Sequence, residues 1–177
     1  LRHGGHLVVS AGSGGGFQGD AIVNAANQGC QGGGGVDGAI HRAAGPELLA
    51  ACRSVPEVVA NVRCPTGEAR ITPAFGTLQC KWVIHTVGPV YHNDVESKPR
   101  LKAAYTSVFE LAVHHGVKTI GLPAVSCGVY AYPLDEAASI AIECARKAPD
   151  TIDRIVFVLF NDKVFDAFSA RLGIAVE

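Results

Sequence analysis

Short apolar runs alternate with helical repeats along most of this chain. Six runs have the length and composition of strands, and the last of them is nearly all apolar, which suits the centre of a sheet. The predicted strands are residues 7–10, 21–24, 68–72, 82–87, 119–122 and 154–160. Helical spacing or helix-ending residues predict helices at 36–44, 47–53, 101–115, 134–148 and 162–172. The interior stretch 92–98 is expected to be a loop.

The alternation of strands and helices in the second half predicts an α/β fold. Parallel strands are joined by right-handed crossovers, so we expect a mostly parallel sheet between helical layers. Ligands of such sheets bind outside the carboxyl ends of the strands. Three connections fall at those ends: residues 25–35, residues 123–133 and the turn after Phe160.

The composition fits one apolar domain of 177 residues. Hydrophobic residues make up 48% of the chain and the net charge is −1, so a nucleic-acid partner is not expected and backbone amides would have to bind any phosphate. No apolar run has membrane length. The six cysteines include no CxxC pair, which favours reduced thiols over a metal centre or a disulfide framework. Because the sequence begins at Leu1 and has no Met, we expect a domain excised from a longer chain.

A glycine-rich turn leads into the first predicted helix. The four glycines at 32–35 leave backbone amides free at a helix N-terminus, where they favour an anion such as phosphate. Asn27 offers both a donor and an acceptor, which suits sugar hydroxyls, whereas Asn24 is more typical of a structural turn residue.

Asp37 lies in the first turn of that helix. An acid at this position commonly does no more than stabilise the helix N-terminus, and position alone favours this interpretation. A carboxylate beside a phosphate site also repels the ligand, however, which indicates that it has a chemical task. His41 follows one turn later on the same face, so the two side chains can meet.

Two further strand ends carry candidate ligand groups. Residues 126–130 form a second turn before a helix, which is either an ordinary connection or a second set of amides for a diphosphate. Phe160 is either a core residue or a platform for a nucleobase, and the residues alone leave these two interpretations equal. His85 lies inside a predicted strand and is expected to be a core histidine with satisfied hydrogen bonds.

Five stretches in register resemble the macrodomain family, and among macrodomains the MacroD type. They are DAIVNAAN (20–27), GGGGVDGAIHRAAGPELL (32–49), CPTGEARIT (64–72), WVIHTVGPV (82–90) and PAVSCGVYAYP (123–133). Their order and spacing hold from about residue 7 to residue 172, and FNDKVFDAF (160–168) is similar to viral macrodomains. The resemblance implies one macrodomain over residues 1–177, a three-layer α/β/α sandwich with a mixed, mostly parallel central sheet.

The resemblance also implies that the ligand is ADP-ribose. The implied ligand-binding residues are Ser13, Ile22, Asn24, Gly33, Gly34, Gly35, Val36, Ser126, Cys127, Gly128, Val129, Tyr130, Phe160 and Asn161. The two turns would hold the diphosphate and distal ribose, and Phe160 would stack on adenine with Ile22 lining the same pocket. Ser13 stands where the family usually has an Asp that accepts from adenine, and Cys127 where Thr is common.

The implied activity is removal of mono-ADP-ribose from acidic side chains of proteins, together with deacetylation of O-acetyl-ADP-ribose. The implied catalytic residues are Asn27, which would orient the distal ribose, and Asp37, which would position or help activate a water. No metal or other cofactor is implied. The alternatives are a non-catalytic ADP-ribose reader and a weak ADP-ribose 1″-phosphatase. The expected partners are ADP-ribose and mono-ADP-ribosylated proteins, and the protein is expected to be an intracellular monomer, in the cytoplasm or nucleus or, if viral, in the host cytoplasm.

Overall fold

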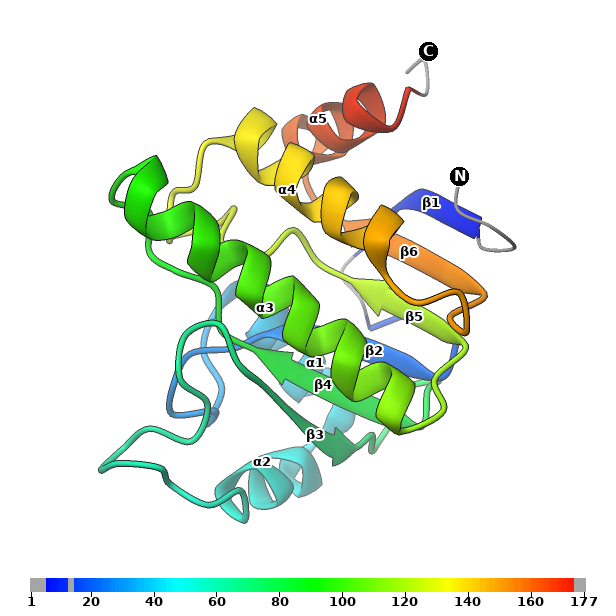
Figure 1. The fold of residues 1–177 in the computed structure, drawn as a ribbon. Coiled ribbons are helices and arrows are strands. Elements are labelled where there is room, and N and C mark those ends of the chain that lie inside the picture. Colours follow the sequence, from blue (N-terminus) through cyan, green and yellow to red (C-terminus); the bar gives the residue numbers. More distant parts are fainter. Residues whose placement is uncertain (1–5, 13–14, 174–177) are drawn as a thin grey trace.

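The structure is a computed structural model that describes residues 6–12 and 15–173. Within these residues a six-stranded sheet runs through the molecule in the order β1-β6-β5-β2-β4-β3 (Figure 1). Its strands are β1 (His6–Ala11), β2 (Ala21–Ala25), β3 (Ala69–Pro73), β4 (Trp82–Thr86), β5 (Thr119–Leu122) and β6 (Arg154–Leu159). Every neighbouring pair is parallel except β3 with β4. The predicted mixed, mostly parallel sheet is therefore confirmed.

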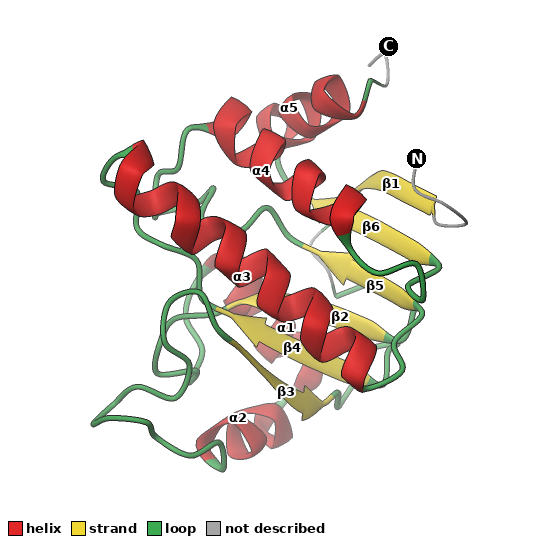
Figure 2. Cartoon of the chain, in the orientation of Figure 1, coloured by secondary structure: helices red, strands yellow, loops and turns green. Residues whose placement is uncertain are grey.

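Helices cover both faces of this sheet (Figure 2). The helices are α1 (Gly35–Ala44), α2 (Pro46–Arg53), α3 (Asp94–His114), α4 (Leu134–Lys147) and α5 (Asp162–Leu172). One core cluster joins the sheet to α3, α4 and α5, and a smaller one joins β2 and β4 to α1 and α2. This is the predicted three-layer α/β/α sandwich.

Side-chain alternation along β2 places different residues on the two faces of the sheet. Val23 packs into the larger core on the α3 side, whereas Ile22 packs into the smaller core on the α1 side. Asn24 is two residues beyond Ile22 and therefore also faces α1. Asn24 lies opposite His85 in the parallel register of β2 and β4. The sheet thus brings two polar side chains together beneath α1.

The loop predicted at 92–98 is wrong, because α3 begins at Asp94 rather than at residue 101. The side chain of Asn93 caps the helix by accepting a hydrogen bond from the backbone N–H of Glu96 at 2.9 Å. Asn93 and Glu96 have the spacing of a capping box, so the sequence did contain a signal for this start. Pro99 lies inside the helix and cannot donate to the carbonyl of Val95, but Val95 is 85% exposed, so water can serve that carbonyl.

Candidate functional site

A cleft of about 480 Å³ opens at the carboxyl ends of β2, β5 and β6. Its lining comes from the end of β2, the turn that follows it and the first turn of α1, together with the loop between β5 and α4 and single residues after β4 and β6. The described residues that line it are Ala25, Ala26, Asn27, Gly33, Gly34, Gly35, Val36, Asp37, Gly88, Pro123, Ala124, Val125, Ser126, Gly128, Val129, Tyr130 and Phe160. The two glycine-containing turns predicted to act together therefore face one cavity.

Backbone amides are the anion-binding groups of this cleft. None of the described lining residues is a lysine or an arginine. The N-cap of α1 is Gly34, which has no side chain, so no capping side chain occupies the first-turn amides. Across the cleft, the amides of Gly128 and Val129 have no backbone acceptor within the described part of the chain. Together with the positive end of the α1 dipole, these amides suit a diphosphate.

The loop between β5 and α4 is held against the strand end by specific contacts. Ser126 has a positive φ of 66° and donates from Oγ to the carbonyl of Pro89 at 2.8 Å. A Cβ added to Gly88 would collide with the Ser126 hydroxyl, so the close approach of these two segments requires glycine there. A Cβ added to Gly128 would instead meet no protein atom within 4 Å. The Gly128 backbone is therefore open to the cleft.

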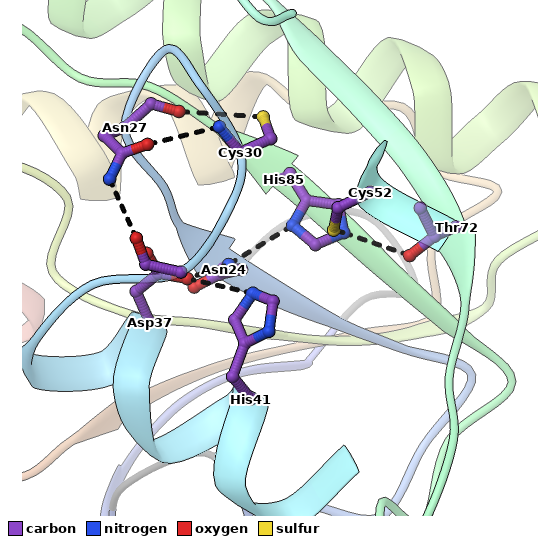
Figure 3. Close-up of polar contacts among 9 residues, drawn as sticks. Asn24, Asn27, Cys30, Asp37, His41, Cys52, Thr72 and His85 are labelled. Carbon is purple, nitrogen blue, oxygen red and sulfur yellow. Dashed lines mark hydrogen bonds and ion pairs between the residues drawn. The ribbon is translucent and has the colours of Figure 1, made fainter. Parts of the chain in front are cut away.

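Asp37 is the only carboxylate among the described residues that line the cleft, and it is 4% exposed. Its Oδ1 accepts a hydrogen bond from Asn24 Nδ2 at 2.8 Å (Figure 3). His41 Nε2 lies 3.4 Å from the same oxygen, so the predicted meeting of Asp37 and His41 is confirmed as a close contact. Burial raises the pKa of Asp37, and the Asn24 hydrogen bond and the nearby His41 partly oppose that rise. The result is a weakly hydrated carboxylate that takes up a proton more readily than an exposed one.

Asn27 shapes the turn that precedes α1. Its Nδ2 donates to the carbonyl of Gly32 at 3.0 Å, and its Oδ1 accepts from the amide of Cys30 at 3.2 Å (Figure 3). Each end of the amide keeps a further hydrogen-bonding valence. Because Asn27 is exposed and lines the cleft, those valences are available to a ligand.

The cleft brings together most of the predicted site residues but not all of them. Ile22 is 1% exposed and lies in the smaller core, and Asn24 is fully buried behind Asp37. Cys127 is half-buried and donates its thiol to the carbonyl of Val125. Ser13 lies outside the described residues. Ligand contact by these four residues stays a prediction.

Phe160 lies where two hollows meet, because it lines both the cleft and a neighbouring cavity of about 410 Å³. Its side chain is 63% exposed, so it is a surface aromatic rather than a core residue. Asn161 also lines the second hollow, and its side chain caps α5 by accepting from the amide of Lys163 at 2.9 Å. A flat ligand group could reach this second hollow from the cleft by passing over Phe160.

Two buried residues near Asp37 were not predicted to belong to the site. His85 Nδ1 lies 3.2 Å from Asn24 Nδ2, and His85 Nε2 lies 3.0 Å from the hydroxyl of Thr72. His85 is a core histidine with polar partners, as expected, but one of those partners also holds Asp37. Only the pairing of β2 with β4 places His85 next to Asn24, and this pairing cannot be predicted from the sequence of either strand alone.

The remaining chemistry of the described residues is limited. All six cysteines are free thiols, of which Cys30, Cys52 and Cys64 are buried. In the ranges 6–12 and 15–173, no three His, Cys, Asp or Glu side chains gather as metal ligands. Across the same ranges, none of the helices combines the length and hydropathy that crossing a membrane requires.

Comparison with known sequences finds one family over most of the chain. The Macro domain family model matches residues 23–141. A Macro domain-containing protein of Streptomyces nogalater is 45% identical over 154 residues, which cover 87% of this chain and 84% of that protein. A Macro domain-containing protein of Xanthomonas campestris is 46% identical over 158 residues, which cover 87% of this chain and 88% of that protein.

Solved structures give the same result. The Oceanobacillus iheyensis macrodomain with ADP superposes with a TM-score of 0.89 at 35% identity, covering 98% of this chain and 94% of that chain. The Trypanosoma brucei macrodomain in complex with ADP-ribose superposes with a TM-score of 0.85 at 39% identity, covering 95% of this chain and 69% of that chain.

Proposed function

The chain belongs to the Macro domain family, and we propose that it is a MacroD-type hydrolase that releases mono-ADP-ribose from acidic side chains of proteins. The observation that carries the proposal is the buried Asp37 carboxylate standing among amides suited to a diphosphate. Binding alone would use the amides, and a carboxylate beside them weakens the binding of an anion. Its presence is accounted for if it acts on a water during hydrolysis.

The proposed binding mode follows the shape of the cleft. The amides on its two sides hold the diphosphate, the distal ribose lies between Asn27 and Asp37, and adenine packs against Phe160. The relatives solved with ADP and with ADP-ribose support a ligand of this class. A nucleoside diphosphate carrying a second sugar also suits a cleft that shares Phe160 with a neighbouring hollow.

The proposed reaction is hydrolysis at the anomeric carbon of the distal ribose. A water oxygen bonds to that carbon while the bond to the substrate's carboxylate oxygen breaks, and the carboxylate leaves with the electron pair. The proton of the water passes to Asp37 or to a phosphate oxygen, and Asn27 orients the sugar. A carboxylate is a good leaving group, so the scheme requires no strong protein acid. O-acetyl-ADP-ribose carries an acetyl ester on the same ribose and is the proposed second substrate; there the water bonds to the acetyl carbonyl carbon, the bond from that carbon to the ribose oxygen breaks, and acetate and ADP-ribose are released.

The experiment that tests the proposal follows free ADP-ribose released from a protein that carries mono-ADP-ribose on glutamate. Asp37→Ala is expected to lower kcat by about 1,000-fold. It should change the Kd for ADP-ribose by less than about threefold, because the amides remain. Asp37→Asn keeps the shape and removes the charge, and should lose turnover to a similar extent.

Two outcomes would contradict the proposal. If the unmodified protein binds ADP-ribose but releases none from the glutamate-linked substrate, it is a reader. If Asp37→Ala weakens binding and turnover equally, Asp37 has a binding or folding role instead. An arginine-linked substrate serves as the control, because a guanidine is a poor leaving group and the scheme provides no acid to protonate it.

A further inference from the structure

A chain of four buried polar side chains runs from Asp37 away from the cleft into the α1 side of the sheet (Figure 3). Asn24 Nδ2 lies 2.8 Å from Asp37 Oδ1 and 3.2 Å from His85 Nδ1, and His85 Nε2 lies 3.0 Å from Thr72 Oγ1. The exposed fractions are 4% for Asp37, 0% for Asn24, 1% for His85 and 4% for Thr72. Water therefore screens the electrostatic interactions among these four side chains only weakly, and each hydrogen bond has a large influence on the next.

The geometry fixes the tautomer of His85. The Asn24 NH₂ group carries two hydrogens, so it can donate one to Asp37 and the other to His85. His85 Nδ1 must then be an acceptor, and in a neutral imidazole the proton lies on Nε2. That N–H faces the hydroxyl of Thr72, which can accept it.

Asp37 and this tautomer of His85 together hold the orientation of the Asn24 amide. If the amide were rotated by half a turn, its carbonyl oxygen would face both the Asp37 carboxylate and the lone pair of His85 Nδ1. Three acceptors would then meet in a buried space, which is unfavourable. The observed orientation is kept although Asn24 Oδ1 is buried without a hydrogen-bond partner in the described part of the chain. The hydrogen bonds of the amide are thus concentrated on its NH₂ end.

The Asp37 carboxylate is divided by this arrangement into an inner and an outer oxygen. Oδ1 faces Asn24 and His41, whereas a Cβ built on Gly33 would lie 3.1 Å from Oδ2. Because Gly33 lines the cleft, Oδ2 is the oxygen on the ligand side. Asn24 therefore binds Oδ1 and leaves Oδ2 free to interact with the water that attacks the substrate.

The ionisable groups next to these four buried side chains come from three segments: α1, α2 and the turn before α1. His41 on α1 approaches Asp37, and Cys52 on α2 lies 3.6 Å from His85 Nε2. Cys30, in the turn before α1, interacts electrostatically with both Asp37 and Cys52. Burial lowers the pKa of His85 to about 3, and burial raises the pKa of Cys52 to about 12. Both shifts favour the neutral form of the group near neutral pH.

We propose that His85 and Asn24 are positioning residues for Asp37: His85 accepts from Asn24, which locks the amide so that it donates to Oδ1 and leaves Oδ2 directed at the cleft. This inference rests on the proposed hydrolytic function of the same site. Neither residue lines the cleft. Each acts through Asp37, whose ionised form the Asn24 hydrogen bond stabilises.

The test compares two substitutions of His85 in the full chain. His85→Gln can still present a carbonyl oxygen to the Asn24 amide, whereas His85→Leu presents no acceptor. We expect His85→Leu to lower kcat on the glutamate-linked substrate by about 100-fold, because Asp37 loses its fixed position. The Kd for ADP-ribose should stay within about twofold, and His85→Gln should recover most of the lost turnover.

Thr86→Val provides the matched control for loss of a buried polar group. Thr86 is the next residue on β4, is fully buried and donates from Oγ1 to the carbonyl of Glu68, away from Asp37. Its substitution should lower stability without the selective loss of kcat. If His85→Leu leaves kcat unchanged while the unmodified protein is active, the inference is wrong. If the unmodified protein shows no turnover at all, the proposed function fails instead.

Nitrogen NMR of the unmodified protein gives a second measurement that needs no variant and no activity. His85 Nδ1 should have the chemical shift of an unprotonated ring nitrogen, and Nε2 that of a protonated one, from about pH 5 to pH 8. A proton on Nδ1 would overturn the inference, because His85 could not then accept from Asn24. This measurement keeps the inference testable even if His85→Leu does not fold.

Discussion

The cleft has two walls that rest on different kinds of interior. The α1 wall, residues 25–37, lies over the buried polar chain from Asn24 through His85 to Thr72. The α4 wall, residues 123–130, lies over an apolar core in which the rings of Tyr105 and Phe157 are 6.3 Å apart. The polar chain beneath the α1 wall can fix the direction of a carboxylate, whereas the contacts beneath the α4 wall, which include the hydrogen bond from the Val125 amide to the Tyr105 hydroxyl, fix where a backbone lies.

This difference assigns different tasks to the two walls. The α1 wall presents both amides and the Asp37 carboxylate, while the α4 wall presents amides and no carboxylate in the described residues. Substitutions in the α4 wall should therefore change the Kd for ADP-ribose and leave kcat largely intact. Substitutions in the α1 wall that disturb Asp37 should do the reverse.

Gly128→Glu in the α4 wall should have the largest effect. The added side chain has no protein atom in its way and would extend into the cleft with a negative charge. Placing like charges together costs several kcal/mol, so we expect ADP-ribose affinity to fall by roughly 1,000-fold in calorimetry. Gly128→Gln has the same size without the charge and should lose much less. An affinity within about fivefold of the unmodified protein would remove this loop from the ligand site.

Gly33→Ala tests the α1 wall with the smallest possible side chain. The new methyl group would lie 3.5 Å from Asn27 Nδ2, an ordinary contact, but only 3.1 Å from Asp37 Oδ2, so the carboxylate must shift by a few tenths of an ångström. We expect kcat to fall by about 10- to 100-fold with a smaller change in Kd. Gly34→Ala is the comparison, since its methyl group meets no protein atom within 4 Å and should affect Kd rather than kcat. Equal kcat values for the two variants would contradict the assigned roles.

The pH dependence of turnover should reflect the ionisation of Asp37, the carboxylate of the α1 wall. Asp37 acts as an ionised group, and burial raises its pKa, so kcat should fall on the acid side at a higher pH than an exposed aspartate would give. Below that pKa the loss should approach about tenfold per pH unit. ADP-ribose binding should not weaken in step, because protonating Asp37 removes a repulsive charge. A kcat that stays constant down to about pH 4 would show that ionised Asp37 is not required.

The sequence predicted the sheet and the two walls because both are local patterns. Apolar runs mark the strands, and the glycines at 32–35 and the segment 126–130 follow strand ends directly. The start of α3 was missed because the stretch before residue 101 carries few apolar residues, although Asn93 and Glu96 marked the cap.

What could not be predicted depends on contacts between distant segments. Asn24 and His85 are 61 residues apart and meet only through the register of β2 with β4. The exposure of Phe160 likewise depends on where β6 ends relative to its neighbours, and its own sequence context does not decide it. Strand pairing rather than strand identity therefore limits how much of the site the sequence reveals.

Tyr105→Phe is the most delicate test of the α4 wall, because it removes one hydroxyl from beneath the loop. That hydroxyl accepts from the amide of Val125 at 3.0 Å and lies 3.4 Å from the carbonyl of Pro123. Its loss leaves a buried amide unpaired, which should lower the free energy of unfolding by about 1–3 kcal/mol in a denaturant titration. The amides of the α4 wall should then be less fixed, so Kd should rise a few-fold while kcat on bound substrate holds. Tyr91→Phe, which removes a hydroxyl that donates to Asp94 near the surface, should change stability much less. If Tyr105→Phe lowered kcat without changing Kd, the α4 wall would also position the reacting groups, and the division between a binding wall and a chemical wall would be wrong.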